Sequence, residues 1–268
     1  MQNIAFGNLQ KMRSQLNSPV DYRLVIGAEE VPLNELIGQS IHMIFSGNIF
    51  CNHCGRKTKK SFNQGFCFPC MRKLACCDSC IMSPEKCHYS QGTCREPEWG
   101  KTNCMIPHFV YLANSSGLKV GITRHTQVPT RWIDQGAHEA IAIAETPNRY
   151  LAGITEVALK KHIADKTNWR TMLKNEIEDK NLVEEREKLK EFIPDEAQDY
   201  YLSSSEEFRL NFPVLEYPKK LKSLNLEKNN SFKGKLKGIK GQYLIFENDV
   251  VFNVRNSEGY VVDFEVLA

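Results

Sequence analysis

Cysteine is missing from most of this sequence. All ten cysteines lie between Cys51 and Cys104, and none occurs in the remaining four fifths of the chain. Secreted proteins that depend on disulfides are smaller, and their bridges are distributed over the whole fold. The pattern therefore argues against a disulfide framework and indicates a local group of cysteines with a role of its own.

Long apolar runs are also missing. No stretch approaches the ~20 apolar residues that cross a bilayer, and the segment MQNIAFGNLQKMRSQ lacks the charged-then-apolar order of a secretion signal. The sequence contains no internal repeat, no phosphate-binding loop and no coiled-coil heptad run. We therefore expect a cytoplasmic protein with no membrane segment and no evident small-molecule cofactor.

The charge is mild overall but unevenly distributed. A net charge of +3 in 268 residues does not by itself indicate nucleic-acid binding. Residues 176–207 are acidic, whereas the positive residues gather in four runs. Such runs are either ordinary solvated surface or patches that contact phosphates. The four runs are residues 56–60, 71–73, 218–222 and 233–240.

The first four cysteines have the spacing of a metal site. The segment CNHCGRKTKKSFNQGFCFPC contains Cys51-x2-Cys54-x12-Cys67-x2-Cys70. Each CxxC turn can direct both sulfurs at one point, and two such turns joined by a short hairpin form a tetrahedral site typical of a zinc ribbon. A glycine after the first pair and another before the second suit the tight turns required. We predict structural Zn²⁺, with an iron–sulfur centre or a redox dithiol as alternatives.

The other six cysteines are less regularly spaced. They share residues 76–108 with His88 and His108, and this segment is poor in aliphatic residues, so we expect a metal ion to order it. One further four-ligand zinc site can be drawn from five of these cysteines, and the spacing leaves open which one is omitted. The alternative is that several are free buried thiols. The five candidates are Cys77, Cys80, Cys87, Cys94 and Cys104.

Residues 111–124, YLANSSGLKVGITR, predict a β-hairpin. Two β-rich runs flank a turn with Asn first and Gly fourth, which fits a type I turn followed by a left-handed glycine. With a loop of residues 115–117, Tyr111 pairs with Gly121, and Lys119 lies diagonal to Tyr111 on the same face at roughly 7–8 Å. A four-residue loop reverses this and sends Lys119 to the opposite face.

Two helices are predicted after the hairpin. The segment TQVPTRWIDQGA has Pro129 near its start, Arg131 in its first turn and Gly136 past its end. After an alternating strand, RYLAGITEVALKKHIADKTNW predicts a longer helix that carries Glu156 beside small and apolar neighbours, where a carboxylate favours a cationic partner. The expected apolar stripe of this helix is Leu151, Ile154 and Ala158.

These residues together resemble the GIY-YIG nuclease superfamily, in the variant whose second signature begins with lysine. The resemblance covers roughly residues 108–175: Tyr111 before the turn, KVGIT at 119–123, then Arg131 and Glu156. The whole chain also resembles an uncharacterised bacterial family, a domain of unknown function in which a cysteine-rich segment leads into such a module. The resemblance implies a small α/β sandwich around three antiparallel strands, and phosphodiester cleavage with one divalent metal ion.

The signatures here read FVY and KVG, so one of the two tyrosines is absent. The resemblance implies Tyr111 as the general base, with Lys119 lowering the pKa of its phenol. Arg131 would hold the scissile phosphate. Glu156 would bind Mg²⁺ or Mn²⁺, which stabilises the leaving oxygen. Each of these residues also has an ordinary structural interpretation, and a fold can persist after its chemistry is lost.

The two ends of the chain predict β structure. Neither residues 1–50 nor residues 231–266 contain enough strands for a sheet alone, so we expect them to meet in one small β-barrel or sandwich. Residues 169–210 are expected to be helical and charged, with a helix that is either solvated or spans between other parts of the fold. The predicted class is α+β, in five segments: an N-terminal β segment (1–50), a zinc-binding segment (51–107), a GIY-YIG-like module (108–175), a charged helical region (176–211) and a C-terminal β segment (212–268).

Two functions from different classes follow. The first is a metal-dependent endonuclease whose zinc segment and basic surface grip DNA or RNA while the central module cuts it. The second is a non-catalytic, zinc-containing nucleic-acid-binding or scaffold protein with a degenerate nuclease fold. A thiol-based metal or redox sensor is the third and least favoured. Phosphate contacts predict binding that weakens with salt in the first two.

Overall fold

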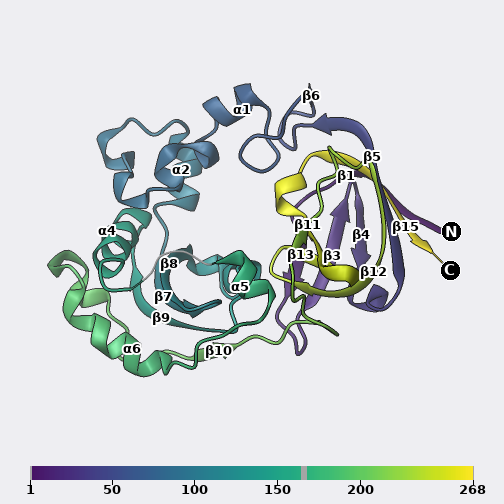
Figure 1. The fold of residues 1–268 in the computed structure, drawn as a ribbon. Coiled ribbons are helices and arrows are strands. Elements are labelled where there is room, and N and C mark those ends of the chain that lie inside the picture. Colours follow the sequence, from purple (N-terminus) through teal and green to yellow (C-terminus); the bar gives the residue numbers. More distant parts are fainter. Residues whose placement is uncertain (1, 164–167, 268) are drawn as a thin grey trace. The chain divides into compact units, whose positions relative to one another are not determined.

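The structure, a computed structural model, describes residues 2–163 and 168–267. The chain divides into two compact units (Figure 1). The first unit consists of Met1–Met71 and Leu210–Ala268, and the second is the contiguous segment Arg72–Arg209. The division falls inside the cysteine-rich segment, so four cysteines belong to the first unit and six to the second.

The first unit is built on an eight-stranded sheet to which both ends of the chain contribute. Its long central strand, β5 (Ser40–Phe50), is antiparallel to β12 (Ser231–Lys240) on one side and to β15 (Tyr260–Leu267) on the other. The strand order is β1-β15-β5-β12-β13-β14-β11, and β6 also pairs with β5. The other strands are β1 (Gln2–Asn8), β6 (Lys57–Thr58), β11 (Lys222–Ser223), β13 (Tyr243–Phe246) and β14 (Val250–Asn253).

A separate sheet of three antiparallel strands completes this unit: β2 (Arg13–Gln15), β3 (Asp21–Ile26) and β4 (Glu29–Pro32). Within the described residues, the predicted barrel does not close, because β1 and β11 end the eight-stranded path without pairing to each other. The last strand, β11, is two residues long and runs parallel to β14, so it offers too short a ladder to continue the sheet.

Polar side chains tie β5 to both of its neighbours. The His42 imidazole places Nδ1 2.7 Å from Glu265 Oε2 on β15 and Nε2 2.8 Å from Ser231 Oγ on β12. On the other face, Ile41 and Met43 are fully buried. This network fixes the register of three strands that come from opposite ends of the chain.

One lysine of the basic run 233–240 is not at the surface. Lys233 and Lys235 are exposed on one face of β12, whereas Lys240 is fully buried at its end. The Lys240 amine lies 5.4 Å from the centre of the Phe212 ring and 5.5 Å from that of Tyr217. Burial lowers the pKa of Lys240 to about 8, so this lysine is part of the core rather than of a charged patch.

The second unit contains a four-stranded antiparallel sheet in the order β10-β9-β7-β8. The β7–β8 register confirms the predicted hairpin: Tyr111 pairs with Gly121 and Asn114 with Leu118, which leaves residues 115–117 as the loop. A fourth strand adds to the three that the superfamily resemblance implied. The strands are β7 (His108–Asn114), β8 (Leu118–Arg124), β9 (Glu139–Thr146) and β10 (Glu207–Arg209).

Helix α4 (Arg149–Leu159) is shorter than predicted, and part of the predicted extension, residues 164–167, lies outside the described residues. The side chain of Asn148 begins the helix by accepting a hydrogen bond from the Leu151 N–H at 3.0 Å. The predicted stripe of Leu151, Ile154 and Ala158 is wrong, since these three are only half-buried. The helix contacts β7 and β8 and also the turn Pro84–Lys86 (η4), so its buried positions are Ala152, Gly153, Thr155, Glu156 and Leu159.

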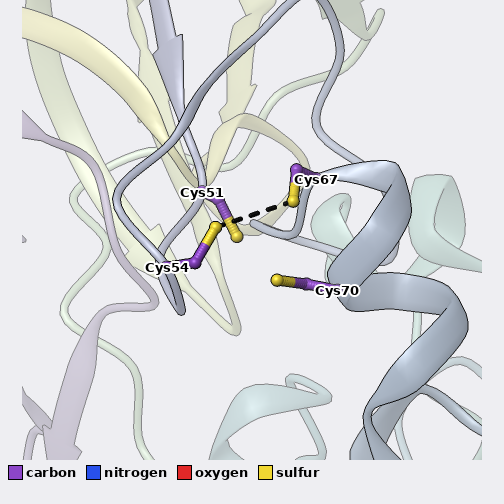
Figure 2. A group of neighbouring side chains, drawn as sticks. All are labelled: Cys51, Cys54, Cys67 and Cys70. Carbon is purple, nitrogen blue, oxygen red and sulfur yellow. Dashed lines mark hydrogen bonds between the residues drawn. The ribbon is translucent and has the colours of Figure 1, made fainter.

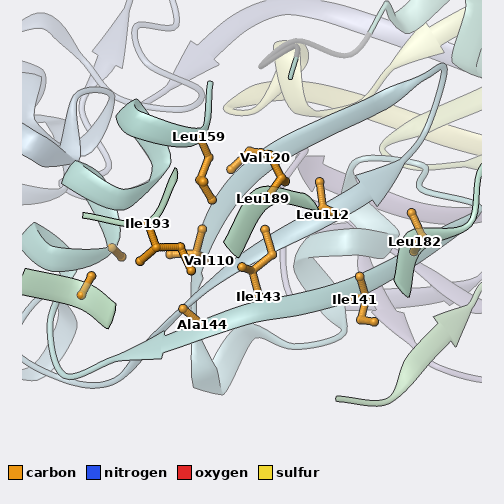
Figure 3. Close-up of a cluster of buried hydrophobic side chains, with 12 residues drawn as sticks. Val110, Leu112, Val120, Ile141, Ile143, Ala144, Leu159, Leu182, Leu189 and Ile193 are labelled. Atoms are coloured by element: carbon orange, nitrogen blue, oxygen red, sulfur yellow. The ribbon is translucent and has the colours of Figure 1, made fainter. Parts of the chain in front are cut away.

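The core of the second unit lies between its sheet and the helices (Figure 3). The strands contribute Val110, Leu112, Val120, Ile141 and Ile143 to this core. The charged region is not simply solvated, because α6 spans only Leu182–Leu189 and buries both of its terminal leucines in the same cluster. No helix within the described residues is both long and apolar enough to span a membrane.

Short helices fill the remaining segments. The other α-helices are α1 (Phe68–Lys73), α2 (Pro97–Asn103), α3 (Thr130–Asp134) and α5 (Trp169–Leu173). The 3-10 helices are η1 (Asn34–Leu36), η2 (Ala75–Cys77), η3 (Ser79–Ile81), η4, η5 (Tyr89–Gln91), η6 (His125–Gln127), η7 (Lys190–Phe192), η8 (Asp195–Tyr200), η9 (Glu247–Asp249) and η10 (Arg255–Ser257). Gly136 follows α3 with a φ of +64°, as the sequence predicts.

Candidate metal centre and polar site

The predicted cluster of four cysteines is present in the first unit. The sulfurs of Cys51, Cys54, Cys67 and Cys70 all lie within 4.8 Å of one another, and those of Cys54 and Cys67 are 3.7 Å apart. Figure 2 shows the four sulfurs gathered around one point. Four sulfurs at ~2.3 Å from a tetrahedral zinc ion lie about 3.8 Å from each other. The cluster therefore has the shape of a structural metal site that fits an ion such as zinc.

Two glycines in the left-handed conformation shape the turns that carry these sulfurs. Gly55 has a φ of +68° and donates its N–H to the Cys51 carbonyl at 2.9 Å, which closes the first turn. Gly65 has a φ of +109° and accepts from the Asn52 N–H at 2.8 Å, which ties the two turns together. Both glycines stand where the sequence pattern predicts them.

The thiol pKa values of the four-cysteine cluster favour a bound cation. Burial raises the pKa of the Cys51 thiol, but the N–H groups of residues 54, 67 and 53 outweigh it and lower this pKa to about 6. The pKa of Cys70 is raised well above its usual range by burial and then by the neighbouring sulfurs. A thiolate thus forms easily at one position and is opposed at another, and a bound metal ion removes that opposition.

The second group of cysteines surrounds one small cavity in the second unit. Cys80, Cys87, Cys94 and Cys104 line it together with two further polar residues, Asp78 and His88. One ligand atom from each of Asp78, Cys80 and His88 lies within 4.8 Å of the others. Of the five predicted candidates, the structure thus brings four to this cavity.

Cys77 is the candidate that stands apart. Its sulfur lies 3.9 Å from that of Cys76, and neither residue lines the cavity. His108 does not line it either, because it opens β7 with its Nδ1 2.7 Å from the Ile106 carbonyl. Adjacent cysteines project in different directions, so Cys76 and Cys77 cannot both turn toward the ligands that follow them.

A separate polar site forms where the hairpin, α3 and α4 meet, and it contains the four predicted catalytic residues. Tyr111 and Lys119 share one face of the hairpin, and the Tyr111 ring covers Gly121, where a Cβ atom would lie 2.7 Å from the hydroxyl. Arg131, exposed on α3, interacts electrostatically with Tyr111 and Lys119. Glu156 interacts with the same three groups.

The expectation that Lys119 lowers the pKa of Tyr111 is wrong. Tyr111 is completely buried, and burial raises its pKa, although the Arg131 guanidinium acts in the opposite direction. The Tyr111 hydroxyl donates a hydrogen bond to Gln135 Oε1 at 3.0 Å. Lys119 is itself buried, and burial, followed by the Arg131 charge, lowers the pKa of its amine to about 7. An amine that is only partly protonated near neutral pH has little charge with which to stabilise a phenolate.

Glu156 is a buried carboxylate among cations. It is 8% exposed, and burial raises its pKa against the opposing influence of Lys160, Arg149 and Arg131. The Lys160 Nζ lies 3.4 Å from Glu156 Oε1, one helical turn away, which supplies the cationic partner that the sequence predicts. Among the described residues, the basic groups Lys119, Arg131, Arg149 and Lys160 all act on Glu156, and such a site favours an anionic ligand.

Comparison with known families matches residues 38–262 to a family described as "Protein of unknown function (DUF2797)". The chain belongs to this family. No curated protein and no solved structure matches the chain. The predicted resemblance of the whole chain to a domain of unknown function is confirmed, whereas membership of the GIY-YIG superfamily stays a prediction.

The region matched to DUF2797 contains both cysteine groups and the whole polar site. Three members of that site were not predicted: Gln135, Arg149 and Lys160. Lys160 and Arg149 lie four and seven residues from Glu156, and these spacings place them on the same side of the helix as Glu156. Helical periodicity could therefore have identified both residues from the sequence. Gln135 meets Tyr111 only through the packing of α3 against the hairpin, for which the sequence carries no local signal.

Proposed function

We propose that this DUF2797 protein is a cytoplasmic, metal-dependent nuclease that cleaves phosphodiester bonds of nucleic acid and carries structural zinc at the four-cysteine cluster. The observation that carries the proposal is that Tyr111, Lys119, Arg131 and Glu156 lie near enough in the second unit to act on one another electrostatically. They come from two strands and two helices, over 46 residues of sequence. A phenol, an amine, a guanidinium and a carboxylate are the groups that phosphodiester hydrolysis needs.

The charge of the site supports a phosphate as the ligand. Arg131 is the exposed cation of the group, so its guanidinium is the one available to bind phosphate oxygens in a bidentate manner. Arg149 and Lys160 add positive charge around Glu156. In the first unit, the exposed Lys233 and Lys235 supply basic surface that suits a nucleic-acid backbone.

The pKa values favour Lys119 over Tyr111 as the group that accepts a proton from water. With its pKa lowered to about 7, the Lys119 amine is partly neutral at physiological pH, whereas burial raises the pKa of Tyr111. A general base works best when its pKa lies near the operating pH. Tyr111, held by Gln135 at 3.0 Å, then serves to orient the reacting groups.

Glu156 is the residue that would hold Mg²⁺ or Mn²⁺. Its carboxylate is the hard oxygen donor that these ions prefer, and a bound ion stabilises the charge on the leaving oxygen. Because Glu156 is surrounded by cations, its affinity for a free divalent ion is low. The fit improves when a substrate phosphate contributes its own oxygens and negative charge, so metal and substrate should bind together.

A second function, that of a non-catalytic nucleic-acid-binding or scaffold protein, is favoured by burial. Tyr111 is 0% exposed and Lys119 is 6% exposed, so little of either group is open to an attacking water molecule. In this interpretation the basic groups dock onto a phosphate backbone and the zinc cluster stiffens the fold. Binding without cleavage is then the expected behaviour.

Incubation with labelled single-stranded DNA, duplex DNA and RNA in Mg²⁺ or Mn²⁺ tests the proposal. We expect cleavage of at least one substrate by the wild type, a loss of ~100-fold or more in Glu156→Gln and in Lys119→Met, and a smaller loss in Tyr111→Phe. Glu145→Gln, at an exposed position of β9, is the matched control and should cleave normally. Salt-sensitive binding without cleavage in either metal would replace the nuclease by the non-catalytic protein.

A further inference from the structure

We propose that the thiolates of Cys80, Cys87, Cys94 and Cys104 hold a second structural metal ion, a soft divalent cation of the zinc type, and that this ion fixes helix α4 in place. The four cysteines come from different turns of the segment between η3 and the end of α2. They line one cavity of about 10 Å³, which has room for a single ion or water molecule. This site does not depend on the nuclease activity.

Asp78 and His88 line the same cavity, but other groups already engage them. The Asp78 carboxylate lies 2.6 Å from Arg95 Nε and accepts a hydrogen bond from the Ser79 hydroxyl at 3.1 Å. His88 places Nδ1 2.7 Å from Thr93 Oγ1 and Nε2 3.7 Å from Asp78. These two residues therefore form a polar network beside the ion and leave the coordination to the sulfurs.

The segment that carries these four cysteines has few aliphatic residues to order it. A metal ion bound by the four thiolates would supply the order that a hydrophobic core supplies elsewhere.

Helix α4 packs against the segment that joins two of the proposed ligands, Cys80 and Cys87. The turn Pro84–Lys86 lies between Cys80 and Cys87, and it approaches α4 so closely that a Cβ atom at Gly153 would be 2.4 Å from the Glu85 nitrogen. Arg149, at the start of α4, donates from Nη2 to the Ile81 carbonyl at 2.7 Å. Helix α4 carries Glu156. By ordering the turn against which α4 packs, the ion would therefore also hold the Glu156 carboxylate in position.

Metal analysis of the full chain tests the ligand set. Each of Cys80→Ser, Cys87→Ser, Cys94→Ser and Cys104→Ser should contain one equivalent of zinc less than the wild type and keep the equivalent held by the first cluster. Cys77→Ser is the matched control and should lose none, and His88→Ala should also lose none. Loss of an equivalent in either of the last two variants would overturn the proposed ligands.

A second measurement leaves the proposed ligands intact, so it holds even if the serine variants fail to fold. In the Cys54→Ser variant, added Co²⁺ should show the absorption of a four-thiolate site, and hydrogen exchange of residues 149–159 should slow when it binds. Absence of a thiolate-to-cobalt band would overturn the site. Binding without slower exchange in α4 would overturn its role in positioning the helix.

Discussion

The two groups of cysteines gather by different physical means, the first around one point and the second around one small cavity. In the first cluster Gly55 is needed for its conformation: it has a φ of +68°, and a Cβ atom there would meet nothing within 4 Å. In the second group the glycines are needed for their size: Gly100 would bring a Cβ atom 3.1 Å from the Cys94 sulfur, and Gly153 leaves no room beside η4. One site is made by local turns and the other by packing.

This difference explains why only the first site could be predicted in full. Local turns leave a regular trace in sequence, since both members of each CxxC pair lie on one turn. Packing brings cysteines together from turns that have no fixed spacing in sequence. The second set could therefore be identified only from the three-dimensional structure. The comparison predicts that the two sites respond differently to the same kind of substitution.

The largest expected effect follows from removing a ligand of the first cluster. In Cys54→Ser, residues 51–70 should lose their hydrogen-exchange protection, because structural zinc supplies ~10 kcal/mol or more in small zinc modules. Trp99, Trp132 and Trp169 all belong to the second unit, so tryptophan fluorescence should remain that of the wild type. A changed fluorescence spectrum would show that the two regions are not independent.

Gly153→Ala tests the packing of the second region. The added methyl group must displace backbone atoms of residues 84 and 85, so we expect a loss of ~2 to 3 kcal/mol in the free energy of unfolding. Urea denaturation followed by tryptophan fluorescence measures this loss. Val157→Ala, at an exposed position of the same helix, should stay within ~0.5 kcal/mol of the wild type. Equal effects of the two changes would contradict a close fit between α4 and η4.

A pH scan of Lys119→Met tests the polar site of the second unit. The pKa of Lys119 is lowered from 10.5 to about 7 by burial and Arg131, so folding costs free energy while the amine is charged in both states, below about pH 7. This cost declines between about pH 7 and 10.5, where the unfolded chain binds the extra proton. The variant should therefore be more stable than the wild type at low pH, and the difference should shrink as the pH rises. A constant difference would contradict the lowered pKa.

The smallest expected effect is that of Gly55→Ala. An alanine fits sterically but must adopt a positive φ, which costs ~1 kcal/mol and should weaken zinc retention in the first cluster by about fivefold. Competition with a chelator measures the change. Gly55→Asn should lose less, because asparagine tolerates the left-handed region. A loss as large as that of Cys54→Ser would mean that the glycine does more than set the turn.

The fold was predictable where it depends on neighbours in sequence. The hairpin register at Tyr111 and Gly121, the end of α3 before Gly136 and the first cysteine cluster follow from turn chemistry. The buried face of α4 was missed because the helix packs on two sides, so an apolar stripe does not mark its contacts. The direction of the Tyr111 pKa was missed for a related reason, since burial depends on what covers the ring.

The central place of β5 has a consequence for how the protein is made. This strand, at Ser40–Phe50, is synthesised early, but the strands that flank it begin only at Ser231 and Tyr260. The contiguous second unit can fold on the ribosome in the meantime, whereas β5 has only the two-residue strand β6 to pair with until then. The nascent chain therefore passes through a stage in which the second unit is folded while the first unit is still incomplete. At this stage aggregation through β5 is the hazard that the cell has to control.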